Sequence, residues 1–271
     1  DRLFLWGTRL TIFLLAIIFG SVVGGQWDTV LQFINMVPFN IEDPAFHKDV
    51  SFYVFTLPLL NMVQGWLLGT IITVTVVTSS IYFINISLRG VNLGQAITAP
   101  IISHASILLG VLLFVITWSY WIDIYELLFS SSGAIFGASY TDLNARLPAL
   151  RILIVVGGLI GLLLLANAYF RSPRIVVGGL GLWIAAAIIV GTVYPSLVQR
   201  FQVDPNELDK ERIYIPRNLE FTRQGFALDR IVEESYNLAT IETGDLAGEL
   251  APLTAETIAA NPGTINNVRL W

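Results

Sequence analysis

Few side chains in the apolar parts of this 271-residue sequence could take part in chemistry. His104 is the strongest candidate, because it lies a short way inside an apolar run, where ionisable groups are costly and often functional. Its imidazole could be an axial ligand of haem or chlorophyll, which makes His104 the candidate cofactor-binding residue. A hydrogen-bonded or interfacial histidine is the favoured interpretation, since a bis-histidine haem would need His47, which is predicted at the opposite membrane face.

Hydroxyl and carboxylate side chains form a second group of candidates. Four threonines in one apolar run could line a path for a solute, but hydrogen bonds to carbonyl groups of their own helix are favoured. Three acids around a predicted loop could bind a cation, yet the spacing of an EF-hand is missing, and we favour solvated acids and predict no metal site. These residues are Thr70, Thr73, Thr75, Thr78, Asp123, Glu126 and Asp142.

The sequence carries no recognisable catalytic motif. It has no G-x-S-x-G, H-E-x-x-H or Walker sequence, and its lack of cysteine excludes disulfides, zinc thiolate sites and cysteine nucleophiles. The net charge is -5, and residues 195–271 hold twelve of the twenty acids, so there is no basic face for a nucleic acid. We expect a protein that is not an enzyme, binds no nucleic acid and requires no cofactor.

The composition is that of a membrane protein. The chain is 55% hydrophobic and 13% charged, with a mean hydropathy of +0.70, whereas about a quarter of the residues are charged in soluble domains. Five segments reach the roughly 20 apolar residues that a membrane-spanning helix needs. We predict an all-α polytopic membrane protein with a transmembrane bundle in residues 1–194, followed by an extracytoplasmic lid and an acidic C-terminal tail in residues 195–271. The predicted spans are residues 5–24, 59–84, 101–122, 150–170 and 175–194.

Arginines beside the spans set the predicted orientation. One set of flanks is basic, while the other set carries most of the acids of the bundle. Because basic flanks stay in the cytoplasm, we place the N-terminus inside and the C-terminal tail outside a bacterial plasma membrane. The chain starts with Asp, and we expect a processed or partial product. The basic flanks contain Arg2, Arg9, Arg89, Arg171 and Arg174.

The outer loop 25–58 is too long and too apolar for a simple connection. Trp27, Val30, Leu31 and Ile34 recur at helical spacing, which predicts a short helix along the membrane surface. After Pro38 the pattern breaks, and the aromatic segment that follows is expected to cap the bundle.

Small residues recur in the predicted spans. Glycines four residues apart allow two helix backbones to approach closely, which favours a packed bundle and leaves open whether some of these faces meet another subunit. The predicted helix-packing or partner-contact residues are Gly20, Gly24, Gly65, Gly69, Gly157 and Gly161.

The segment 194–218, called the collar, joins the apolar part of the chain to the acidic part. Tyr194 and Pro195 are predicted to end the fifth span, because proline interrupts a helix. Bases and acids then alternate, which predicts a salt-bridged lid that folds onto residues 42–58 and 136–148. Pro216 suits the first turn of a helix that continues to about Leu228 and extends through residues 229–238, and the remainder is predicted as loop with at most one short helix near 254–260.

The collar also carries a family resemblance. Tyr194-Pro195, Val198-Gln199-Arg200-Phe201, Pro205-Asn206-Glu207-Leu208, Glu211, Tyr214-Ile215, Asn218 and Thr222-Arg223 resemble the segment after the last span in the large bacterial membrane proteins of uncharacterised protein family 0182. Residues 43–58 and 136–148 resemble the same family. The resemblance implies a plasma-membrane protein with about seven spans and a large extracytoplasmic region, of which this chain is a partial member. It implies no established activity. Our collar candidates are Tyr194, Pro195, Gln199, Arg200, Asn206, Glu207, Glu211 and Arg223.

Three hypotheses of function follow. A structural or accessory subunit, or scaffold, of a larger membrane complex is favoured, because the glycine faces and aromatic residues suit packing and no charged path crosses the spans. Its expected partners are membrane lipids and other membrane protein subunits. A transporter or channel is the first alternative, and a pigment or haem carrier that uses His104 is the second.

Overall fold

The computed structural model describes residues 2–88, 98–131 and 136–228. These residues form helices and no β-strand apart from one isolated antiparallel bridge between Glu42 and Asp49, so the all-α prediction is confirmed. Residues 1–222 form one compact unit, and residues 223–271 form a second, of which only 223–228 are described.

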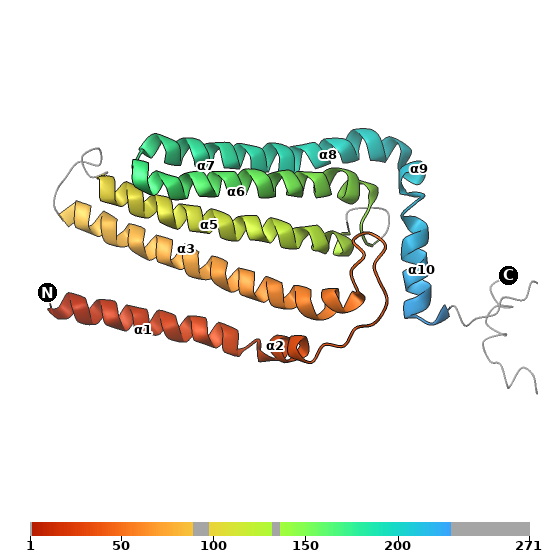
Figure 1. Ribbon diagram of the computed structural model, residues 1–271, viewed down its shortest axis with the longest axis horizontal. Helices are drawn as coiled ribbons and strands as arrows, with labels where there is room; N and C mark the ends of the chain where they lie inside the picture. The colour runs from red at the N-terminus through yellow and green to blue at the C-terminus, as the bar shows by residue number, and fades with distance from the viewer. Residues whose placement is uncertain (1, 89–97, 132–135, 229–271) are drawn as a thin grey trace, which may run out of the picture. The chain divides into compact units, whose positions relative to one another are not determined.

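The long helices of the first unit lie side by side in chain order (Figure 1). Within the described residues, four helical runs are long and apolar enough to span a membrane, and the bent pair α1 and α2 gives a fifth if it is counted as one span. This agrees with the predicted polytopic bundle, although the four helical runs are longer than the predicted spans. The helices are α1 (Arg2–Gly24), α2 (Trp27–Ile34), α3 (Leu57–Leu88), α5 (Ala99–Glu126), α6 (Leu147–Phe170) and α7 (Pro173–Ile188).

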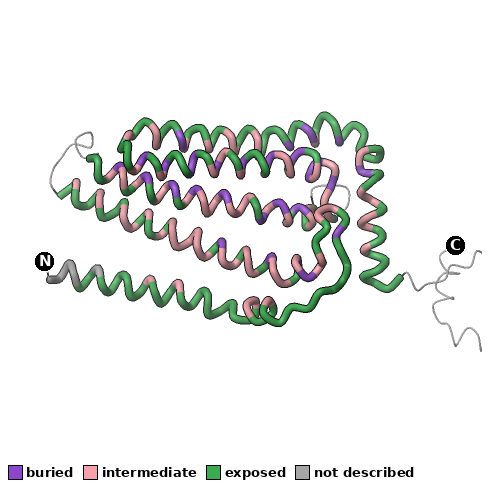
Figure 2. The backbone as a smooth tube through the Cα atoms, viewed as in Figure 1, coloured by how far each residue is buried: buried purple, intermediate pink, exposed green. Residues whose placement is uncertain are grey.

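The best-packed part of the bundle is the pair α5 and α6. Buried residues are concentrated on these helices, while α1 is exposed along most of its described length (Figure 2). A side chain at Gly157 would collide with the hydroxyl of Thr117, and one at Gly161 would press against Phe114 at 3.1 Å. Glycine therefore permits the close approach of the two helices. Apolar side chains fill the seam between α5, α6 and α7, namely Leu113, Ile160 and Leu164, with Leu109, Val156, Val176, Leu180 and Trp183 around them.

Helix α1 is attached to the bundle at fewer points. The indole Nε1 of Trp66 on α3 donates a hydrogen bond to the carbonyl oxygen of Phe19 at 3.3 Å. The rings of Phe19 and Trp66 meet edge to face, with their centroids 6.3 Å apart. Since most of its apolar side chains are exposed, α1 has room to contact lipid or another helix.

In the described part of the chain, four five-residue π-helical turns interrupt the helices, and each ends two residues before a proline. In an α-helix a proline lacks the N–H donor and its ring clashes with the carbonyl group four residues back. A π turn bonds five residues back instead, as the N–H of Leu57 does to the oxygen of Phe52, and so moves the carbonyl groups away from the ring. The turns are η1 (Phe52–Thr56), η3 (Asp142–Arg146), η4 (Ile189–Val193) and η5 (Gln199–Val203), and the prolines are Pro58, Pro148, Pro195 and Pro205.

The prediction that the helix stops at Tyr194 and Pro195 is wrong. The helical run continues from Pro173 to Glu211, because η4, which ends two residues before Pro195, makes room for the proline. This run consists of α7, η4, α8 (Tyr194–Val198), η5, the 3-10 turn η6 (Asp204–Asn206) and α9 (Glu207–Glu211).

The helix predicted around Pro216 is α10 (Ile215–Gly225), which ends slightly earlier than expected. The surface helix predicted from Trp27 is α2, which begins at that residue. The predicted continuation of this helix over 229–238 and the short helix near 254–260 lie outside the described residues.

Candidate functional site

Two segments that lead into helices meet the collar at one end of the bundle. The first entry segment, residues 42–58, leads into α3, and the second entry segment, residues 136–148, leads into α6. Each has two α-helical residues, then a π turn, then Leu-Pro at the start of the long helix. Both segments therefore lie at the N-terminal ends of their helices, α3 and α6.

A buried acid organises the first entry segment. Asp43 is only 3% exposed. Its carboxylate accepts hydrogen bonds from the backbone N–H groups of Ala45, Phe46 and Lys48 at 2.9, 2.6 and 2.8 Å, and from the Tyr53 hydroxyl at 2.8 Å. Four donors compensate for the lost hydration of the charge, so the loop is tied to the helix that follows it.

A second acid of this segment caps the helix start. Asp49 accepts hydrogen bonds from the backbone N–H groups of Phe39, Asn40 and Ser51 at 3.1, 2.8 and 2.8 Å. Hydrogen bonds from Ser51, the side chain first, lower the pKa of the Asp49 carboxyl to about 2, with smaller contributions from Phe39 and Asn40. The carboxylate therefore occupies the position of an N-cap and is charged at neutral pH.

The second entry segment contains a capping box. The fully buried Asp142 accepts hydrogen bonds from the backbone and hydroxyl groups of Ser139 at 3.1 and 2.8 Å, and its own N–H donates to the Ser139 hydroxyl at 3.3 Å. Arg146, one turn on, forms an ion pair with Asp142 at 2.9 Å. Ser-x-x-Asp is the aspartate form of the reciprocal cap that starts many helices.

The collar is fastened to the second entry segment. Glu211, 1% exposed, accepts the backbone N–H of Tyr140 at 3.0 and 3.3 Å. Thr141 bonds Gln199, Asn144 donates to the Tyr214 hydroxyl at 3.0 Å, Asn218 donates to the carbonyl oxygen of Phe136, and the Lys210 ammonium lies 4.8 Å from the ring centre of Tyr140. The prediction that the collar folds onto residues 136–148 is confirmed.

The predicted salt-bridged character of the lid is wrong. Within residues 2–88, 98–131 and 136–228, Arg146–Asp142 is the ion pair closer than 4.0 Å, and no base of the collar takes part in one. The collar uses hydrogen bonds to backbone groups and contacts with aromatic rings instead. Most of the alternating charges lie on the surface instead, since Arg200, Glu207 and Arg223 are exposed, and Glu211 is the buried exception. Of the uncharged candidates, Asn206 is exposed and Pro195 is buried.

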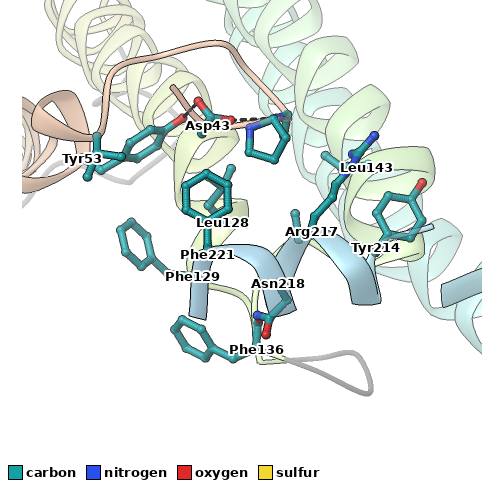
Figure 3. A pocket seen from close by; sticks show the side chains of 15 residues that line it. Asp43, Tyr53, Leu128, Phe129, Phe136, Leu143, Tyr214, Arg217, Asn218 and Phe221 are labelled. Carbon is teal, nitrogen blue, oxygen red and sulfur yellow. Dashed lines mark hydrogen bonds between the residues drawn. The ribbon is translucent and has the colours of Figure 1, made fainter. Parts of the chain in front are cut away.

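A pocket of about 260 Å³, called the collar pocket, lies between both entry segments and α10 (Figure 3). Tyr214, Arg217, Asn218 and Phe221 line it from one helical face, at the i, i+3, i+4, i+7 spacing of such a face. The collar therefore shares a pocket with residues 42–58, as expected. The remaining lining residues are Asp43, Pro44, Ala45, Val50, Tyr53, Leu128, Phe129, Phe136, Gly137, Ala138 and Leu143.

A more polar crevice of about 600 Å³ lies between η3 and α8. None of the three acids considered as a cation site, Asp123, Glu126 and Asp142, lines this crevice. Asp142 is paired with Arg146, and Glu126 accepts a hydrogen bond from Asn61 at 2.5 Å. In the described part of the chain no group of three His, Cys, Asp or Glu residues is placed to hold a metal ion. The crevice is lined by Thr141, Arg146, Gly191, Thr192, Pro195, Ser196, Gln199, Arg200 and Asp204.

His104 lies on α5, beside the end of α3 that is farthest from the entry segments. Its Nδ1 is 2.9 Å from the Tyr82 hydroxyl, and the two rings meet edge to face. The favoured prediction of a hydrogen-bonded histidine is confirmed. His47 belongs to the first entry segment, so the two histidines are not brought together, and a single-histidine ligand site stays a prediction.

The candidate threonines bond to their own helix. Thr70, Thr73 and Thr75 donate to carbonyl oxygens four residues back at 2.8, 2.8 and 2.7 Å, as favoured from the sequence. The packing glycines divide into two groups. Gly157 and Gly161 lie against α5, and a side chain built at Gly69 would come within 3.6 Å of the Phe19 ring. No described atom lies within 4 Å of a side chain built at Gly20, Gly24 or Gly65.

Four residues of the site were not predicted from the sequence, namely Asp43, Tyr53, Ser139 and Tyr140. The capping box Ser139–Asp142 is a local signal that could have been found. The partners of Asp43 and Glu211 have no such signal, because Tyr53 and Tyr140 contribute through the folded arrangement of the segments.

Comparison with known proteins identifies relatives of this chain. Residues 2–271 match the sequence model of a family described as "Uncharacterised protein family (UPF0182)". A UPF0182 protein of Thermobifida fusca is 36% identical over 269 residues, which cover 99% of this chain and 25% of the relative. A UPF0182 protein of Desulforamulus reducens is 35% identical over 258 residues, covering 95% and 26%, and one of Nostoc is 34% identical over 268 residues, covering 97% and 26%. The chain thus spans about a quarter of the length of these relatives. No solved structure matches it.

Proposed function

The chain belongs to the uncharacterised protein family UPF0182, and on that premise we propose that it is a structural element, the membrane scaffold of a larger complex. In this proposal the bundle holds the collar, and the chain that follows the collar, in a fixed position at the extracytoplasmic face of a bacterial plasma membrane. The open side of α1 and α3 receives other membrane subunits.

The buried bond between Glu211 and Tyr140 is the observation that supports this proposal best. Removing a carboxylate from water is costly, and the N–H of Tyr140, shared between the two carboxylate oxygens at 3.0 and 3.3 Å, offsets part of that cost only when the collar lies in one position. A free linker between two regions would need no such contact. A junction that fixes direction is what a scaffold requires, and a buried polar contact can specify one arrangement among several.

The arrangement of α1 supports the second part of the proposal. Most apolar side chains of α1 stay exposed despite the Trp66 contact, and a side chain built at any of four glycines on α1 and α3 would meet no described atom within 4 Å. Small residues allow a further helix to approach closely in a membrane, where packing rather than the hydrophobic effect drives association.

Purification from native membranes in mild detergent tests the scaffold. We expect membrane proteins to co-purify with the full-length protein and cross-linking to attach them to α1 or α3. Glu211→Ala should release the collar and raise its protease sensitivity, while Glu207→Ala, an exposed acid of the same collar, should not. A protein that purifies alone, with no cross-linked neighbour in native membranes, would contradict the proposal.

A further inference from the structure

We propose that the collar pocket binds an anionic phospholipid of the surrounding membrane, with part of one acyl chain inside the pocket and the headgroup at Arg217. This inference does not depend on the scaffold function.

The lining of the collar pocket is apolar and suits an acyl chain. The rings of Phe129, Phe136 and Phe221 and the side chain of Leu128 form much of it (Figure 3). The pocket volume of about 260 Å³ exceeds the roughly 150 Å³ of a cavity that holds benzene. It is smaller than the roughly 300–1,000 Å³ of sites that enclose a whole drug-sized ligand. The pocket can therefore take part of one chain, and the rest of the lipid must stay outside.

The charge of the pocket selects an anionic head. Arg217 projects from α10 and rests 5.7 Å from the ring centre of its neighbour Tyr214. It has no ion pair within 4.0 Å in the described part of the chain. The acid of the pocket, Asp43, already accepts four hydrogen bonds from its own segment. A guanidinium group binds phosphate oxygens in pairs. The positive charge of Arg217 favours a phosphodiester whose headgroup carries no cation of its own, as in phosphatidylglycerol, over one that is neutralised by choline.

The position of the pocket favours a membrane lipid over a soluble anion. Tyr53 and Phe129 belong to the ends of two helical runs that are long enough to span a membrane. The ends of such spans lie where headgroups meet acyl chains, at the level that aromatic side chains prefer. A phospholipid can therefore place a chain in the pocket and its phosphate beside Arg217 without leaving the bilayer.

Photolabelling in nanodiscs tests this site with the full-length protein. The probe is phosphatidylglycerol with a diazirine on one acyl chain, and the comparison probe is phosphatidylcholine with the same chain. We expect phosphatidylglycerol to label peptides within 128–143 and 214–221 about tenfold more than phosphatidylcholine does, the effect of one charge-assisted contact.

Two variants and one control separate charge from shape. Arg217→Gln should lower the phosphatidylglycerol labelling about tenfold and the phosphatidylcholine labelling clearly less, because the choline cation already offsets the phosphate charge. Arg212→Gln, at an exposed arginine that does not line the pocket, should change neither. Phe221→Trp should fill the pocket and reduce labelling by both probes. Equal labelling by the two probes, an equal loss in Arg212→Gln, or labels confined to other peptides would overturn the proposal. Thermal melting of each variant shows that it is folded.

Discussion

The two entry segments begin their helices in the same way but connect to different parts of the chain. Each has an acid or serine cap, a five-residue π turn and a Leu-Pro pair. In the first segment the buried acid Asp43 is satisfied entirely within residues 43–53. In the second, Tyr140 and Thr141, beside the cap, bond to collar residues about 60 to 70 positions further along the chain.

The first segment is a closed loop, whose polar groups bond within the segment, whereas the second is a joint, which connects its helix to the collar. The first segment seals one helix start, and a change there should stay local. The second segment combines a helix start with the attachment of the collar, so a change there should move two parts of the chain. The same helix start therefore serves two structural purposes, according to whether the donors beside it bond within their own segment or bond to the collar.

The largest effect is expected from Asp43→Ala. The substitution leaves four donors without their acceptor, and we expect the free energy of unfolding to fall by about 3 kcal/mol. Hydrogen exchange should become faster within residues 44–53 and stay unchanged within 136–148. Glu42→Ala, at the exposed neighbouring acid, is the control and should have little effect. Equal loosening of both entry segments would contradict the distinction between them.

Asp142→Ala should have the next largest effect, about 2 kcal/mol of unfolding free energy, because it removes the cap of Ser139 and the ion pair of Arg146. Unlike the first substitution, it should also loosen the collar, which limited proteolysis between 204 and 214 would detect. Asp28→Ala removes an exposed acid from the first turn of α2 and serves as the control. A collar that stays protected in Asp142→Ala would show that the second segment is not a joint.

A pair of single-hydroxyl deletions sharpens the comparison. Tyr53→Phe and Ser139→Ala each remove one hydroxyl donor from a buried acid, and each should cost about 1 kcal/mol. Since Asp43 and Asp142 share no hydrogen-bond partner among the interactions described, the double variant should lose the sum of the two effects, within about 0.5 kcal/mol. A coupling larger than that, measured by unfolding in detergent, would mean that the two segments act as one network.

The smallest effect is a pH dependence at Asp49. Because hydrogen bonds lower the folded pKa of this carboxyl to about 2 from an ordinary 3.8, its stabilisation is fully present above about pH 4. It is lost as the pH falls through about 2. Exchange of the Phe39, Asn40 and Ser51 amides should become faster over that interval. Asp49→Asn should remove the pH dependence, and an unchanged profile in that variant would assign the effect to another group.

Much of the bundle could be predicted from the sequence, because the length and apolar character of a span are local properties. The attachment of the collar to residues 136–148 also followed, although its chemistry did not. Alternating charges suggested ion pairs, whereas Glu211 bonds a backbone N–H, a group that every residue except proline carries and that no pattern distinguishes. The continuation of the helix through Pro195 was missed because a π turn has no simple sequence signal beyond the proline itself.

The π turns before the collar have a consequence for its direction. A π turn behaves as an α-helix with one additional residue, and each residue of an α-helix advances the helical phase by about 100°. Both η4 and η5 precede Glu211 in a single helical run. One additional residue would turn the rest of a regular α-helix by about 100°, but a π turn takes the residue up in one wider turn and leaves the phase of the following residues nearly unchanged. The turns η4 and η5 therefore keep Glu211 facing Tyr140 while they make room for Pro195 and Pro205, and a one-residue deletion in either turn would bring back the proline clash and leave the direction of the collar nearly unchanged.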